Sequence, residues 1–344
     1  MTPQTVFAIA TSCVIVLGLQ ASAWTAERTA RAVQKSPEVQ RAVQRALDFL
    51  AANQNADGSW SSGSYQRHPA ITGLAGLAFL SAGSTPLEGP HARRIHRAIE
   101  FLLSQTNPTT GLIGGSSPDS PVMYAHGFAV LFLAEAYGMG SPPALEHALR
   151  RATALIVQSQ RRDGGWRYEP LPVGESDLSV TVCQVMALRA ARNAGIAVPK
   201  GVIDDAITYV KHSANPNGAF RYMLGANQHT SFALTAAGLT ALYSAGVYDA
   251  PELQRGLNYL FDFLRRSGYR SPDYFLYGHY YAAQAFFQAG SPFWELYYRD
   301  LSAELLRQQR ADGGWNSKEG DVFGTAVAAI LLQMPNQYLP IFER

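Results

Sequence analysis

Cysteine is almost absent from this sequence. Only two of its 344 residues are cysteines, Cys13 and Cys183. Cys13 lies in an apolar run that we expect to be removed, which leaves Cys183 alone and excludes an intramolecular disulfide. A large apolar core must therefore stabilise the fold, and a hydrophobic content of 47% is enough to build one.

Charge is also scarce, and neither sign dominates. Lysine and arginine total 28, aspartate and glutamate total 26, and the formal net charge is +2. A nucleic-acid partner is not expected, because the chain has no basic excess with which to neutralise phosphates. The high apolar content also excludes a disordered chain.

The N-terminus holds an apolar segment over residues 6–19. It is shorter than the roughly 20 residues that a spanning helix needs, and Ala21 and Ala23 follow it with the spacing of a cleavage site. We therefore expect a signal peptide over residues 1–23 and one domain over 24–344. Export across the cytoplasmic membrane follows, to the periplasm or beyond. The first residues lack Lys and Arg, so a membrane anchor stays open if the signal is not cleaved.

A turn with a central glycine recurs along the rest of the chain. Its spacing is 45 to 54 residues, and its members are Gly58, Gly111, Gly164, Gly218, Gly268 and Gly313. Glycine after a polar residue supplies the positive φ that ends a helix. Six periods of this length indicate an internal repeat.

Each period holds two segments of helical pattern. The first is amphipathic, as in residues 38–52 and 144–158, and the second is apolar on all sides, as in residues 71–80 and 232–242. An all-apolar helix must be buried all round. We therefore predict an all-α fold, an (α/α)6 toroid of six helix pairs with an apolar inner ring and an amphipathic outer ring. A straight solenoid needs polar capping repeats, whereas the last segment, residues 326–332, is apolar.

Three of the six turns share the pattern Gln-x-x-Asp-Gly-x-Trp. Its fixed residues are Gln54, Gly58 and Trp60, then Gln160, Gly164 and Trp166, then Gln309, Gly313 and Trp315. The pattern resembles the QW motif of squalene and oxidosqualene cyclases, found in related form in protein prenyltransferase β subunits. Residues 280–288 and 338–342 also resemble a bacterial group of secreted proteins of this kind. The resemblance implies a terpenoid-cyclase-like toroid in which these nine residues are structural.

The catalytic groups of those relatives are missing. The resemblance places an Asp-x-Asp-Asp acid at residues 177–180, where Ser179 and Val180 stand in place of two aspartates. Zinc-dependent prenyltransferases carry Asp-x-Cys, but Thr181 lies two residues before Cys183. We predict neither a cofactor nor a metal site. A divalent metal is left open only because titratable residues recur in the repeats.

One titratable residue stands near the start of each apolar helix. If these helix ends converge on a central cavity, their side chains are candidates for acid–base or ligand-binding roles. The catalytic candidates are Asp177, His279, Tyr281 and His126. The ligand-binding candidates are His68, Tyr124, His229, Tyr277 and Asp321.

Three functions fit these features. The first is a toroid that binds an isoprenoid or other lipid-like molecule in an apolar cavity, as a terpene cyclase or prenyltransferase-like transferase or isomerase, or without catalysis. The second is a secreted scaffold that binds another protein. The third is a carbohydrate-active enzyme, which needs two facing carboxylates and has four candidates, Glu175, Asp177, Asp273 and Asp321. The oligomeric state stays open.

Overall fold

The computed structural model describes residues 36–114, 121–140, 143–225, 227–269 and 274–343. Over these residues the chain forms twelve α-helices, α2 to α13, followed by two short 3-10 helices. The predicted signal peptide lies outside the described residues. Within them, no helix has the length and apolar content needed to cross a membrane.

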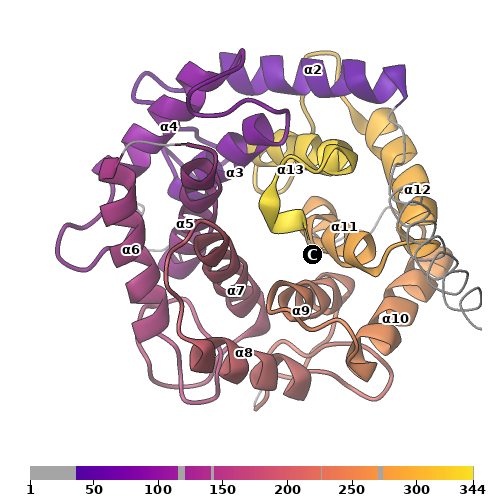
Figure 1. The fold of residues 1–344 in the computed structure, drawn as a ribbon. Coiled ribbons are helices and arrows are strands. Elements are labelled where there is room, and N and C mark those ends of the chain that lie inside the picture. Colours follow the sequence, from indigo (N-terminus) through magenta and orange to yellow (C-terminus); the bar gives the residue numbers. More distant parts are fainter. Residues whose placement is uncertain (1–35, 115–120, 141–142, 226, 270–273, 344) are drawn as a thin grey trace, which may run out of the picture.

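The helices alternate between an outer and an inner ring (Figure 1). The outer ring consists of α2 (Pro37–Ala52), α4 (Ala92–Ser104), α6 (Pro143–Gln158), α8 (Lys200–His212), α10 (Pro251–Ser267) and α12 (Phe293–Gln308). The inner ring consists of α3 (Pro69–Leu80), α5 (Val122–Gly138), α7 (Leu178–Asn193), α9 (Phe232–Ser244), α11 (Phe275–Ala289) and α13 (Asp321–Gln333). The last inner helix, α13, packs against α2 and α3, which closes the ring. The predicted all-α toroid is therefore confirmed, and a straight solenoid is excluded.

Burial follows the two patterns in the sequence. In the outer helix α4, the buried residues recur at helical spacing along one face, whereas all twelve residues of the inner helix α3 are buried. Inner helices also approach each other closely. A Cβ added at Gly76 would lie 2.3 Å from the Phe132 ring on α5. A larger residue at this position would clash with the Phe132 ring unless that ring moved.

The three Gln-Trp turns share one set of hydrogen bonds. The indole N–H of Trp166 donates to the Ile156 carbonyl at 2.7 Å, in the last turn of α6. The Gln160 amide donates at 2.8 Å both to Gly164 in its own turn and to Val202 on the next outer helix, α8. The other two turns repeat this arrangement through Trp60, Trp315, Gln54 and Gln309. These residues therefore join three of the outer helices to the next one, α2 to α4, α6 to α8 and α12 to α2.

The C-terminal segment closes one end of the ring. The 3-10 helix η2 (Pro340–Phe342) packs against α7 and α11, and Figure 1 shows the chain ending at the centre of the ring. The Gln288 amide donates to the Phe342 carbonyl at 2.6 Å, and the Ile341 N–H donates to the Glu135 carboxyl at 3.4 Å. This end holds the C-termini of the inner helices. Their N-termini lie at the opposite end.

Candidate ligand cavity

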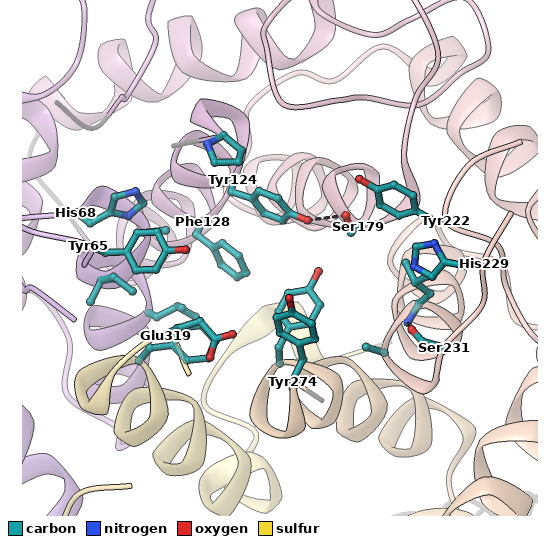
Figure 2. Close-up of a pocket in the computed structure, with 18 residues that line it drawn as sticks. Tyr65, His68, Tyr124, Phe128, Ser179, Tyr222, His229, Ser231, Tyr274 and Glu319 are labelled. Atoms are coloured by element: carbon teal, nitrogen blue, oxygen red, sulfur yellow. Dashed lines mark hydrogen bonds between the residues drawn. The ribbon is translucent and has the colours of Figure 1, made fainter. Parts of the chain in front are cut away.

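A cavity of about 370 Å³ lies at the N-terminal ends of the inner helices (Figure 2). All six inner helices contribute to its wall, one residue each at an equivalent position: Ala70, Tyr124, Ser179, Ala233, Tyr277 and Phe323. Aliphatic and aromatic side chains such as Ile71, Leu74 and Phe128 complete the interior. The volume falls in the lower part of the range of small-molecule sites.

The residue two places after each of these wall positions forms a hydrogen bond to the backbone of the turn that precedes its helix. Thr72, Thr181, Thr235 and Thr325 each accept, through Oγ1, the backbone N–H of the residue two places after the turn glycine. Two residues along a helix correspond to a rotation of about 200°. The wall residue therefore faces the cavity while the residue two places later faces the turn outside it.

His126 stands two residues after the wall residue Tyr124, and it does not line the cavity. Its Nδ1 accepts the Ile113 N–H at 3.1 Å, and its Nε2 lies 3.0 Å from the Ala152 carbonyl on α6. Burial lowers the pKa of this ring to about 4, so it is neutral. His126 thus replaces the threonine of the other repeats. Its placement argues against the predicted catalytic role.

His279 occupies the corresponding position on α11 and is also absent from the cavity wall. Its two ring nitrogens lie 2.7 Å from the Tyr297 hydroxyl and 3.0 Å from the Tyr269 carbonyl. The ring is fully buried, and burial lowers its pKa to about 4. Both nitrogens are engaged, so a catalytic role for His279 finds no support in this geometry.

Four predicted ligand-binding residues do line the cavity: His68, Tyr124, His229 and Tyr277. His68 precedes α3, and burial lowers the pKa of its ring to about 4. His229 is exposed, with its Nδ1 2.8 Å from the Asn227 side-chain oxygen. Figure 2 shows these two histidines on opposite sides of the cavity, so they do not form one site.

Asp177 lies behind the wall and reaches the cavity only through other residues. Its carboxyl caps α7, accepting from the Val180 N–H at 2.9 Å and from the Ser179 hydroxyl at 2.6 Å. Ser179 in turn accepts from the Tyr124 hydroxyl at 2.5 Å. Burial raises the pKa of Asp177, and its Oδ2 has no hydrogen-bond partner among the described residues. At the position where the sequence resemblance places the cyclase acid, this cavity presents Ser179.

Tyr281 also lies behind the wall, one helical turn after Tyr277. Its hydroxyl is 3.2 Å from the Cys183 sulfur, and both side chains are buried. Burial raises the pKa of Cys183 to about 12, so the thiol carries no charge and is a poor nucleophile. Tyr281 is therefore not among the residues that line the cavity.

Asp321 points away from the cavity, and Glu319 lines it instead. The Asp321 carboxylate pairs with Arg310 at 2.5 Å. Glu319 is the only carboxylate among the described lining residues. Tyr65, Tyr222 and Tyr274 also line the cavity from connecting segments. These residues precede the inner helices, so the apolar periodicity of the helices does not identify them. Glu319 is indicated in the sequence only by its place two residues before Asp321.

The described residues form neither a metal site nor the pair of carboxylates that a carbohydrate-active enzyme needs. No group of three His, Cys, Asp or Glu side chains among them is placed to hold a metal ion. Of the four carboxylates considered for sugar chemistry, Glu175, Asp177 and Asp321 are absent from the lining, and Asp273 lies outside the described residues. A facing pair of carboxylates is therefore not formed by the described wall.

A closed ring of helix pairs around a central cavity defines this protein as an α/α toroid. The sequence pattern of the prenyltransferase alpha-alpha toroid domain matches residues 73–269, more than half of the chain. The chain belongs to that family. No curated protein matches the sequence.

Solved structures of two kinds share the fold. The type II terpene cyclase MstE from Scytonema superposes with a TM-score of 0.62 at 16% identity, covering 88% of this chain and 100% of the cyclase. A variant of that cyclase bound to geranylgeranyl dihydroxybenzoate gives 0.60 at 16% identity, covering 88% and 98%. An alpha-1,6-mannanase of Salegentibacter gives 0.65 at 6% identity, covering 88% and 100%. At these identities the similarity establishes the fold alone.

Proposed function

We propose that this protein binds one isoprenoid or other lipid-like molecule in the central cavity and does not cyclise it. The observation that carries the proposal is the cavity itself, about 370 Å³ in volume and lined mainly by aliphatic and aromatic side chains. Removing apolar ligand surface from water supplies the affinity. Support comes from the related cyclase MstE, a variant of which was solved with a geranylgeranyl substrate.

The wall position on α7 supports the proposed lack of cyclisation. Protonation of an alkene needs a strong acid that faces the substrate, and Ser179 faces the cavity there. Asp177 is screened from the cavity by Ser179 and Tyr124, and it accepts hydrogen bonds through one oxygen. The hydroxyl of Ser179 binds a polar group well but does not protonate a carbon–carbon double bond.

The direct test is solvent extraction of the purified full-length protein, followed by mass spectrometry of the extract. We expect a lipid-like compound in about equimolar amount. The same protein, stripped and titrated with farnesol, should bind one equivalent and release it unchanged. No bound lipid together with no farnesol binding contradicts the proposal, and recovery of a cyclised product contradicts its second half.

Filling the cavity should abolish this binding. Ala233 is a half-buried wall residue on α9, so Ala233→Trp places an indole in the cavity with little disturbance of the outer ring. We expect at least a tenfold loss of farnesol affinity in calorimetric titration, with the thermal unfolding midpoint changed by a few degrees at most. The matched control is Ala197→Trp in an exposed loop, which should bind as the original chain does. Equal affinity in both variants would place the ligand elsewhere.

A further inference from the structure

Glu319 is the one charged side chain among the described residues that line the cavity. Figure 2 shows its carboxylate pointing into the space between Tyr65 and Tyr274. Within the protein it accepts a hydrogen bond from the Ser317 hydroxyl, and no described lysine or arginine pairs with it. A carboxylate beside an apolar cavity is most stable with a cationic partner.

The aromatic rings around Glu319 fit the same kind of partner. Tyr65 and Tyr274 are 36% and 51% exposed, so part of each side chain is accessible to an incoming group. The Lys318 ammonium lies 4.6 Å from the centre of the Tyr274 ring and 3.4 Å from its hydroxyl, so this ring already contacts one cation of the protein itself. Lys318 itself does not line the cavity, and its exposure to water weakens its repulsion of a ligand cation.

The N-termini of the inner helices favour an anion in the cavity, because each carries a partial positive charge. The partial charge at a helix N-terminus is about half an elementary charge, and its effect falls off within the first turn. A carboxylate carries a full unit charge, so at the same distance it acts on a ligand cation more strongly than one helix N-terminus does. Asp177 already satisfies the N-terminus of α7. At the Glu319 side of the cavity, the local full charge therefore favours a cationic group.

We infer that the natural ligand carries an ammonium group on an apolar body, with the ammonium at Glu319 and the apolar part among the wall residues. This inference rests on the proposed function and specifies its ligand class. It disfavours fatty acids and prenyl diphosphates, whose charge is repelled by Glu319. A neutral lipid alcohol is tolerated, because its apolar part buries the same surface.

The test compares three ligands of one carbon skeleton: farnesylamine, farnesol and farnesoic acid, titrated calorimetrically at pH 7. We expect the amine to bind about tenfold more tightly than the alcohol, and the acid to bind most weakly. In 0.5 M salt, the preference for the amine should fall to a few-fold, because exposed ion pairs are screened. This comparison needs no variant, so a folding defect does not obscure it.

Glu319→Gln should then remove the preference for the amine, so that the affinities for farnesylamine and farnesol measured on this variant agree within about twofold. The control Glu295→Gln changes an exposed carboxylate on the outer helix α12, and we expect the preference to persist there. If farnesol binds but the amine shows no advantage, or the advantage survives Glu319→Gln, the inference is wrong and the proposed function stands. If none of the three ligands binds, the proposed function itself fails.

Discussion

Replacing Trp166 with alanine should lower the free energy of unfolding by about 3–5 kcal/mol. The indole is fully buried, and its N–H bond to Ile156 fixes the end of α6. Its backbone N–H is held in turn by Thr181 on α7 at 3.0 Å. Loss of the ring therefore leaves a cavity where an outer helix, a turn and an inner helix meet, together with an unpaired carbonyl.

Urea denaturation followed by circular dichroism measures the effect of Trp166→Ala as a shift in the transition midpoint. Trp166→Phe keeps most of the packing and removes the N–H, so we expect a smaller loss of about 1–2 kcal/mol. Leu171→Ala, at a 48% exposed position in the following loop, should change stability by less than about 0.5 kcal/mol. If Trp166→Ala were as stable as Leu171→Ala, the contacts of Trp166 with α6 and α7 would not stabilise the fold.

The ring architecture was predictable because its signals are local. Each turn glycine adopts a positive φ, as at Gly58, Gly164 and Gly313, where φ is +91°, +92° and +89°. At Gly164 a Cβ would lie 2.2 Å from the Asp205 carbonyl, so a side chain is excluded by both conformation and space. Apolar periodicity then separates inner from outer helices, and six pairs leave few ways to bury the inner ones.

The residues of the cavity were less predictable because the direction of a side chain depends on single positions along a helix. Tyr124 and Tyr277 face the cavity, whereas His126 and His279, two residues later, face the turns. The only sequence signal for these histidines is that they lie near the start of an inner helix. That position does not determine the direction in which a side chain points. Glu319 belongs to a connecting segment without periodicity, so only the folded chain places its carboxylate in the cavity.

The stability of the protein should be greatest near pH 6.5 and should fall on both sides. Burial lowers the pKa of His68, His126 and His279 to about 4 from a usual 6.5. The unfolded chain therefore binds more protons than the folded chain between pH 6.5 and 4, and stability falls as the pH decreases. Burial raises the pKa of Glu135 to about 8 from a usual 4.5. The folded chain binds the extra proton between pH 4.5 and 8, so this group reduces stability as the pH rises.

Above pH 6.5 the three histidines are neutral in both the folded and the unfolded chain, so of these four groups only Glu135 still makes stability depend on pH. The free energy of unfolding should fall by up to about 1.4 kcal/mol per pH unit until pH 8. Glu135 lies at the closed end of the ring, where Ile341 donates to it, so its ionisation weakens the docking of the C-terminal segment. Glu135→Gln keeps a neutral group of the same shape. We expect urea titrations from pH 5 to 9 to show that this variant loses the alkaline decline and keeps the acid one. An unchanged alkaline decline in Glu135→Gln would show that another group titrates there.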